Sequence, residues 1–423
     1  MSFVAALAGL AVASVIGFSG VELLADSTAG KQASGQADVV QTQRLPFTST
    51  ALVGVVDEGG QLTSVSAWVL GTAGVGGSII GIAATADGAS GTTDTLAPLA
   101  ALYEVSGPED FRNAVEQLTG LSFDVIEVVD QQRFAQLVSP LGDLPVLLPI
   151  SFADASTGDS WEAGDVSLTS PGAARAITAT DPAVADWFYE SARASVWRAL
   201  TDRVGAGVGS VTPIASDRDV PIPRNLDEFA DRLFAEPVEF RALGFSPIDP
   251  ERVGEQLRPE YRGALGDVDV VVAHDRAEMA IVFGAIAPSR LGAPLDAPVF
   301  RVVSPFGDAD LEGLDLNRSD VLKRAIDGLF FAKANVVSVA DISDEPVPEV
   351  TQVLVADEEV IDAVRELYEP LFGEIEIRVA TVTIDGIDIE VTLGRSFLDG
   401  LRGDSTPVVA GSEDDDDADD SDG

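Results

Sequence analysis

The chain has 423 residues, with 70 acidic and 26 basic side chains and a formal net charge of -44 at pH 7. So large an excess of negative charge repels phosphate backbones and excludes nucleic-acid binding as the main role. Because the chain has no cysteine and a single histidine, His274, disulfides, thiolate catalysis, cysteine-ligated metals and His–His metal sites are also excluded.

The hydrophobic content separates this chain from disordered acidic proteins. It reaches 46%, and the length predicts about two or three domains with cores of their own. Lysine occurs only at Lys31, Lys323 and Lys333, and the other basic residues are arginine. Exposure to high salt or a GC-rich coding bias would each give a surface that is rich in acidic residues and poor in lysine.

The amino terminus, residues 1–26, is expected to form a transmembrane anchor. Phe3–Leu24 is an apolar run that, at about 1.5 Å per residue, spans the roughly 30 Å core of a bilayer. No basic residue precedes this run, and it is longer than the apolar stretch of a signal peptide. The alternatives are a cleaved signal and a buried core helix. The flanking charges alone do not place the body outside the membrane.

Residues 27–44 are rich in small and amide side chains and are expected to form a flexible stalk. Residues 45–292 then alternate between strand and helix patterns, which predicts an α/β domain. The expected strands are 51–57, 64–70, 78–84, 123–130, 145–149 and 268–275. The expected helices are 108–120, 133–142, 182–200, 225–235 and 276–286, with Ser170 and Pro171 expected to start one more.

A proline-rich segment, 288–298, predicts a domain boundary, and residues 297–402 form the second expected domain. Their pattern reads β-α-β-β-α-β, with one helix face made by Leu322, Ala325, Ile326 and Leu329 and a second by Val360, Val364 and Leu367. Two strands are expected around Asp385. Residues 403–423 are an acidic run, which predicts a disordered, solvated tail.

The order of these segments resembles the LytR-CpsA-Psr family of the cell envelope. Asp94–Pro149 is similar to the middle of the family's catalytic domain, and Leu168–Ile177 occupies the place of one of its helix starts. Phe300–Leu398 is similar to the small LytR-type carboxy-terminal domain. The resemblance implies a central mixed sheet flanked by helices, followed by a small α+β domain and preceded by the transmembrane helix.

The family implies a membrane-anchored, outward-facing enzyme that moves glycopolymers from polyprenyl-pyrophosphate carriers to the cell wall, with Mg²⁺ and arginines at the pyrophosphate. In this chain the matching arginine position is Ala84 and the matching aspartate position is Thr85. The family's arginine-rich helix is reduced to Arg193 and Arg198, which are the phosphate-contact candidates. A local ion pair or a solvent-facing position is the alternative for each.

Without those charges we expect a degenerate, non-catalytic cell-envelope accessory, a pseudoenzyme, that works on the outer side of the membrane in cell-wall glycopolymer assembly. Its expected partner is a polyprenyl-linked lipid or a cell-wall polymer, with Mg²⁺ needed only if catalysis survives. An active phosphotransferase with displaced groups and a structural surface protein are the alternatives. His274 lacks a serine partner for catalysis, and Gly71–Gly77 lacks the helix of a dinucleotide site.

Overall fold

The computed structural model describes residues 41–89, 95–181, 183–204, 220–263, 270–292, 297–343 and 346–403. The apolar run, most of the expected stalk and the acidic tail beyond Gly403 lie outside the described residues. Within the described part of the chain, no helix is long and apolar enough to cross a membrane. Gln41–Gln43 and Ala380–Asp385 form one compact unit and the other described residues form a second, so each is described by itself.

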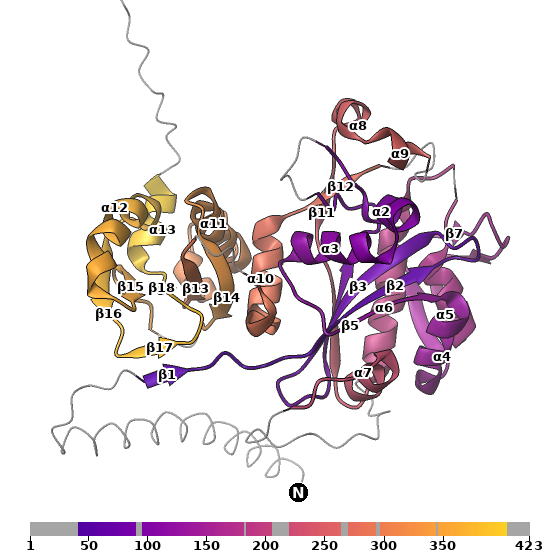
Figure 1. Ribbon diagram of the computed structural model, residues 1–423, viewed down its shortest axis with the longest axis horizontal. Helices are drawn as coiled ribbons and strands as arrows, with labels where there is room; N and C mark the ends of the chain where they lie inside the picture. The colour runs from indigo at the N-terminus through magenta and orange to yellow at the C-terminus, as the bar shows by residue number, and fades with distance from the viewer. Residues whose placement is uncertain are drawn as a thin grey trace, which may run out of the picture. The chain divides into compact units, whose positions relative to one another are not determined.

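A five-stranded mixed sheet forms the centre of the first half of the chain (Figure 1). Its strands, in spatial order, are β10 (Val238–Ala242), β4 (Gly77–Ile82), β3 (Leu62–Leu70), β2 (Thr50–Val56) and β5 (Val125–Asp130). Strand β3 is antiparallel to both neighbours, while β2 pairs in parallel with β5 and β4 with β10. Four strands therefore run in one direction, and their carboxyl ends lie at the same edge. The mixed α/β architecture is as expected.

Alternation along β2 divides the buried side chains between two cores. Ala51, Val53 and Val55 belong to one cluster, whereas Leu52 belongs to the other. This is the two-residue period of a strand whose two faces are both covered.

Helices cover both faces of this sheet. The helices that contribute to the first core are α4 (Gln131–Val138), α5 (Ser170–Thr178), α6 (Glu190–Val204) and α7 (Leu226–Leu233). Those that contribute to the second core are α2 (Leu99–Ser106), α3 (Pro108–Thr119) and α10 (Arg276–Ile286). The result is a three-layer arrangement, with helices α2 and α3 and helices α4 and α5 on opposite sides of the sheet in Figure 1.

Two expected elements are shorter in the structure than in the sequence prediction. The helix predicted at 182–200 begins at Glu190, because a 3-10 turn, η2 (Asp186–Tyr189), precedes it and places Asp186 against Arg193. The strand predicted at 268–275 is β12 (Val272–His274), which pairs with β11 (Phe245–Pro247) and not with the central sheet. Val271 and Val272 are buried in the second core instead.

A second five-stranded sheet lies in the carboxy-terminal part. Its strands, in spatial order, are β14 (Asn335–Asp341), β13 (Val299–Ser304), β18 (Ile389–Thr392), β15 (Thr351–Val355) and β16 (Ile375–Val379). Its helices are α11 (Arg318–Phe331), α12 (Ile361–Phe372) and α13 (Arg395–Gly403). The predicted order β-α-β-β-α is present as β13, α11, β14, β15 and α12. Strand β16, which was not predicted, follows α12 in the chain. The predicted closing strand is β18, which lies between β13 and β15 in the sheet.

Helix α10 contributes to the cores on both sides of the predicted boundary segment. Met279 and Phe283 pack in the second core of the central sheet, whereas Ala277 and Ala280 pack in the core of the carboxy-terminal sheet. Gly284 lies against β14, where an added Cβ would be 3.1 Å from Val339 Cγ2. One helix thus serves two hydrophobic cores.

The small unit contains one of the two strands expected around Asp385. Strand β17 (Val382–Ile384) pairs in parallel with β1 (Gln41–Gln43) and not with β18. Gln41–Gln43, at the end of the segment expected to be a stalk, is therefore a strand. The remaining short elements are β6 (Leu144–Leu148), β7 (Phe152–Ala153), β8 (Ser160–Trp161), β9 (Gly164–Leu168), α8 (Pro250–Gln256) and α9 (Pro259–Arg262).

Candidate functional site

The carboxyl edge of the central sheet is where several polar segments come together. Asp57 and Glu58 follow β2 directly, and β5 ends at Asp130, which Gln131 follows. Open sheets with parallel strands usually bind ligands beyond the carboxyl ends of those strands. This edge is therefore the first place to look for a ligand site.

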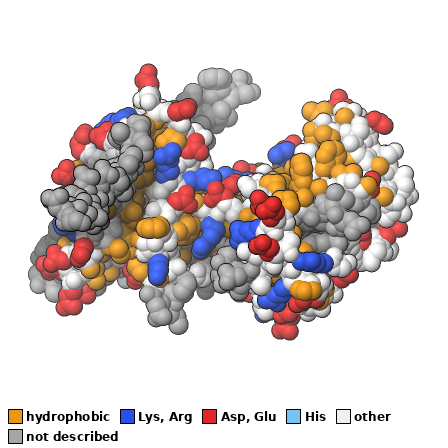
Figure 2. All heavy atoms as spheres, turned by 90° about the horizontal axis from the view of Figure 1, so that it is seen from above, with side chains coloured by type: hydrophobic (Ala, Val, Ile, Leu, Met, Phe, Trp, Pro, Cys, Tyr) orange, Lys and Arg blue, Asp and Glu red, His pale blue; other side chains and the backbone are white. Residues whose placement is uncertain are grey.

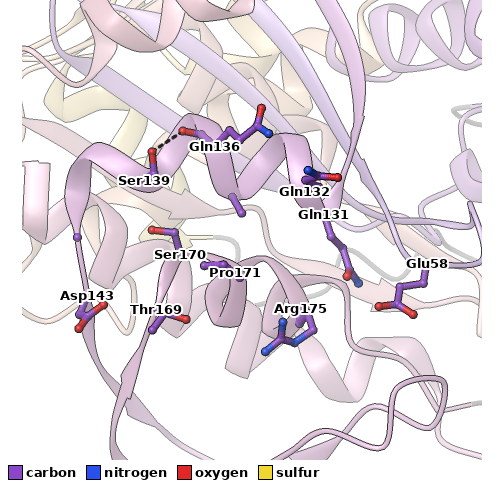
Figure 3. Close-up of a pocket in the computed structure, with 12 residues that line it drawn as sticks. Glu58, Gln131, Gln132, Gln136, Ser139, Asp143, Thr169, Ser170, Pro171 and Arg175 are labelled. Atoms are coloured by element: carbon purple, nitrogen blue, oxygen red, sulfur yellow. Dashed lines mark hydrogen bonds between the residues drawn. The ribbon is translucent and has the colours of Figure 1, made fainter.

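A cavity of about 680 Å³ opens at this edge between helices α4 and α5 (Figure 3). Nine of its twelve lining residues are polar, and all of these but Arg175 are uncharged or acidic, so we call it the amide cleft. Its lining residues are Glu58, Gln131, Gln132, Ala135, Gln136, Ser139, Gly142, Asp143, Thr169, Ser170, Pro171 and Arg175. In Figure 3 the glutamines extend from α4, Ser170 and Arg175 belong to α5, and Glu58 lies at one end.

Side-chain caps fix the helices on both sides of the amide cleft. Asp130 accepts a hydrogen bond from Arg133 N at the start of α4, and Thr169 accepts one from Gly172 N at the start of α5. The cap of α5 is thus Thr169 and not the expected Ser170, because Ser170 is already in the first turn. Gln131 Nε2 donates to Thr178 Oγ1 at 2.6 Å and joins the two helices.

The amide cleft is acidic despite its arginine. Arg175 Nε donates to Asp159 Oδ2 at 2.5 Å, so its charge is already paired. Glu58 and Asp143 are exposed, and neither forms an ion pair with the described residues. Amide groups and hydroxyls both donate and accept hydrogen bonds, and carboxylates accept them. The cleft is suited to a polyhydroxylated ligand and disfavours an anion.

Arg193, the first phosphate-contact candidate, is buried away from the amide cleft. Its guanidinium donates to both carboxylate oxygens of Asp186, at 2.6 and 2.9 Å, to Glu190 Oε1 at 2.9 Å and to Ala179 O at 3.1 Å. Its side chain is only 3% exposed. The sequence predicted local carboxylate pairing as the alternative to phosphate contact, and this is the arrangement that the structure has.

Glu190 is the second carboxylate on Arg193. Burial, together with repulsion from Asp186, raises the pKa of Glu190 to about 7, although Arg193 opposes this shift. Asp186 takes the two-point contact with the guanidinium, so Glu190 is the group that binds a proton first. The cluster stabilises the turn before α6.

Arg198, the second candidate, is exposed on the other side of α6. A separation of five residues places two side chains on different faces of a helix, which agrees with the sequence prediction for Arg193 and Arg198. The structure brings neither arginine to the amide cleft.

Ala84 and Thr85, at the positions that match the family's arginine and aspartate, follow the carboxyl end of β4. Both are buried, at 1% and 4% exposed. Ala100 N donates to Ala84 O at 2.9 Å, and Val272 N donates to Thr85 O at 3.1 Å. Thr85 Oγ1 is buried and has no hydrogen-bond partner among the described residues. This loop is held by its backbone and presents no charge.

His274 has a structural role in the same region. Its Nδ1 donates to Gly244 O at 2.8 Å, and its Nε2 accepts from Ala83 N at 3.2 Å. The two partners define a neutral ring, and burial lowers the pKa of His274 below its ordinary value. Both ring nitrogens are used, so the ring joins the end of β4 to the segment after β10.

The described residues do not fit the Mg²⁺ site that the family implies. They contain no group of three or more His, Cys, Asp or Glu side chains that could hold a metal ion. Asp57 and Asp87, which follow β2 and β4, serve as backbone acceptors: Asp57 binds Gln61 N, and Asp87 binds Ala89 N and Ala97 N. Mg²⁺ prefers a near-octahedral set of oxygens, and these carboxylates are already engaged.

Sequence reasoning missed the glutamines of the amide cleft. Gln131, Gln132 and Gln136 lie in a QQRFAQ segment directly after a strand that was predicted correctly. Three glutamines at the carboxyl end of a predicted strand were the signal in the sequence that could have indicated a ligand site. Pairing with α5 could not be read from the sequence.

Comparison with known proteins finds similar solved structures but no matching family model. No family model matches the chain, and no curated protein matches it. Similar solved structures include B. subtilis TagV, with 13% identity over 56% of this chain and 94% of that chain and a TM-score of 0.37. A LytR-Csp2A-Psr enzyme from Actinomyces oris has 18% identity over 54% and 95% of the two chains, with a TM-score of 0.35. TagT bound to LIIa-WTA has 15% identity over 55% and 98%, with a TM-score of 0.35. TM-scores of this size do not establish a common fold.

Proposed function

We propose that this chain is a LytR-CpsA-Psr-like cell-envelope protein that binds a cell-wall glycopolymer in the amide cleft and does not transfer it. Anchoring through Phe3–Leu24, with the body outside the membrane, is part of this proposal. The single observation that carries it is the lining of the cleft, where amides, hydroxyls and carboxylates surround one arginine that is already paired.

Hydrogen-bonding chemistry supports a sugar as the ligand. A sugar presents many hydroxyls, each of which both donates and accepts, and the three glutamines with Ser139 and Ser170 can match them. A phosphate would instead meet Glu58 and Asp143, with Arg175 held by Asp159. The glycan part of a glycopolymer is therefore a better ligand than its phosphates.

Packing beside the sheet supports a polymer over a polyprenyl tail. Aromatic side chains pack between the sheet and helices α4–α7, with Trp68 and Trp197 ring centroids 6.4 Å apart and Phe134 and Trp197 centroids 5.4 Å apart. A polyprenyl tail could lie in this layer only by displacing these rings.

The charges in the structure support binding without catalysis. Arginines that stabilise a transferring phosphoryl group are typically worth on the order of 3 kcal/mol each in the transition state. Here Ala84 and Thr85 carry no charge, and Arg193 is held by two carboxylates. Transfer, if tested, is expected to be absent or very slow.

The test has two parts, both on the full-length chain. A polyprenyl-pyrophosphate-linked glycan and Mg²⁺ are supplied, and transfer is followed by mass spectrometry; robust turnover would contradict the proposal and support an active phosphotransferase. In parallel, glycan binding is measured by calorimetry for the wild type, for Gln132→Ala with Gln136→Ala, and for Gln352→Ala as a control on β15.

We expect saturable binding that weakens at least tenfold in the double variant and is unchanged in Gln352→Ala. If the wild type binds no glycan at all, the structural surface protein becomes the better description.

A further inference from the structure

A group of aromatic side chains lies on β7, β8 and the 3-10 turn η2, and we call it the aromatic platform. It consists of Phe152, Trp161, Trp187, Phe188 and Tyr189. Phe152 stacks on Trp161 with centroids 4.8 Å apart, and it meets Tyr189 edge to face at 5.9 Å. Tyr189 in turn contacts Phe188 at 5.8 Å, and Trp187 precedes Phe188 on the same turn, η2.

The inner members of the platform are buried and the outer members are not. Phe152 and Tyr189 are 7% and 2% exposed, whereas Trp187 and Phe188 are 43% and 40% exposed. Tyr189 OH also donates to Ala153 O, which fixes its ring. Large aromatic side chains left in water on a rigid base usually mark a binding surface.

Carboxylates surround the platform. Asp154 is 1% exposed, and its Oδ2 has no hydrogen-bond partner among the described residues. Burial raises the pKa of Tyr189 to about 12, and the nearby carboxylates of Asp181, Asp186 and Asp154 add to this shift, which Arg193 opposes. The nearby arginines are neutralised, Arg175 by Asp159 and Arg193 by Asp186 and Glu190.

These charges decide which occupant fits. An anionic lipid surface or a phosphate-bearing polymer would be repelled by the uncompensated carboxylates. A neutral sugar has an apolar C–H face that can cover an aromatic ring and hydroxyls that donate to carboxylate oxygens. The platform supplies the aromatic rings, and the residues around it supply the carboxylates.

A short loop joins the platform to the amide cleft. Residues Asp154–Asp159 connect β7 to β8, and the loop closes through Asp154 N bound to Asp159 O at 2.9 Å. Asp154 stands at the platform end of this loop, and Asp159, at its other end, holds Arg175 of the cleft. A ligand longer than one sugar could therefore extend from one site to the other.

We propose that the aromatic platform is a second subsite that binds uncharged sugar units of a glycan chain and continues the amide cleft. This inference rests on the proposed function and narrows its ligand to a neutral glycan. Trp187 and Phe188 cover the apolar faces of these sugar units.

The test uses the full-length chain and two probes, a neutral N-acetylglucosamine hexasaccharide and poly(glycerol phosphate), with binding measured by calorimetry. The variants are Trp187→Ala with Phe188→Ala, the conservative Trp187→Phe, and Phe331→Ala as a matched control, because Phe331 is an aromatic residue 88% exposed elsewhere. We expect the hexasaccharide to bind more tightly than the charged polymer. The double variant should weaken hexasaccharide binding at least tenfold, whereas Trp187→Phe and Phe331→Ala should stay within threefold of the wild type.

Two outcomes overturn the inference: unchanged hexasaccharide binding in the double platform variant, or tighter binding of poly(glycerol phosphate). If Gln132→Ala with Gln136→Ala weakens binding while the platform variant does not, the amide cleft stands and the platform fails. If the wild type binds neither probe, the proposed function and this subsite fail together. Circular dichroism of each variant shows whether a loss comes from misfolding.

Discussion

At the scale of single residues, the clearest feature is how often a polar side chain serves the backbone. His274 holds two backbone groups, Asp57 and Asp87 close turns, and Asp130 and Thr169 cap the helices of the amide cleft. Except for those of His274, these contacts join residues close in the chain, and each typically contributes about 1 kcal/mol. They use up carboxylates that could otherwise have bound a metal ion.

His274 predicts a loss of stability in acid. Its folded pKa is below the unfolded value, so protons favour the unfolded chain as the pH falls through that unfolded value. The loss in unfolding free energy should therefore grow as the pH falls below about 6.5, the ordinary pKa of histidine. Urea denaturation of the wild type and His274→Gln at pH 7.5, 6.5 and 5.5 measures it. Equal pH slopes in the two proteins would contradict the prediction.

For Glu190 we predict the opposite dependence of the unfolding free energy on pH. Its folded pKa is raised to about 7, so the neutral form is favoured on folding and stability falls as the pH rises from its unfolded value through pH 7. Glu190→Gln keeps a hydrogen-bond acceptor for Arg193 and removes the titration. The variant should therefore gain stability over the wild type as the pH rises from 5 to 8. Glu359→Gln, on an exposed residue, is the control and should show no such trend.

Lys333 predicts a stabilising substitution. It follows α11 with a φ of 59°, a left-handed conformation that favours glycine, and its N–H bonds Phe330 O. Lys333→Gly should raise the unfolding free energy by about 1 kcal/mol, because the Cβ strain exceeds the added chain entropy. Lys333→Ala removes the same charge but keeps the Cβ, so a gain of the same size in that variant would show that strain is not the cause.

At the scale of elements, hydrophobic spacing predicted most helices and strands and sometimes chose the wrong face. The predicted face of α11 is buried, as Leu322, Ala325, Ile326 and Leu329 all lie in the core. In α12 the prediction was wrong for two of three residues: Val360 and Leu367 are 39% and 50% exposed, and the buried face is Val364, Tyr368 and Phe372. Those three recur every fourth residue, and the aromatic rings carry the larger apolar area.

Gly284 predicts that the packing of α10 on β14 is tight. A Cβ there would lie 3.1 Å from both Val339 Cγ2 and Val339 N, so a valine cannot enter without moving the helix from the strand. Gly284→Val should lower the unfolding free energy by about 1–3 kcal/mol, the usual cost of overpacking. Ala285→Val adds a similar side chain at the next, exposed position and should change it little. Denaturant titration compares them, and equal losses would exclude overpacking as the reason.

At the scale of the whole molecule, the dominant property is the net charge of -44. On the face shown in Figure 2, acidic side chains are spread over the surface and not gathered in one patch. Ion pairs such as Lys323 with Asp275, at 2.5 Å, neutralise only part of this excess. Charge of one sign on a folded chain opposes compaction, and the repulsion is felt over about one Debye length.

Salt should therefore stabilise this protein. Raising NaCl from 0.02 to about 0.3 M shortens the Debye length most steeply, and the thermal midpoint should rise by several degrees in that range. Differential scanning calorimetry at a series of salt concentrations measures this. A midpoint that rises only above about 1 M salt would indicate a general salting-out effect and not screening of self-repulsion.

The sequence by itself determined what depends on composition and local pattern: an acidic α/β chain without cysteine chemistry, most helix and strand positions, and the absence of charge at Ala84 and Thr85. Only the tertiary structure decided that Gln131 and Ser170 share a cleft, that Arg193 is held by Asp186 and Glu190, and that Tyr189 and Phe188 extend the stack of Phe152 and Trp161. Periodicity reports which face of an element is apolar, whereas a site depends on contacts between segments that lie far apart in the chain.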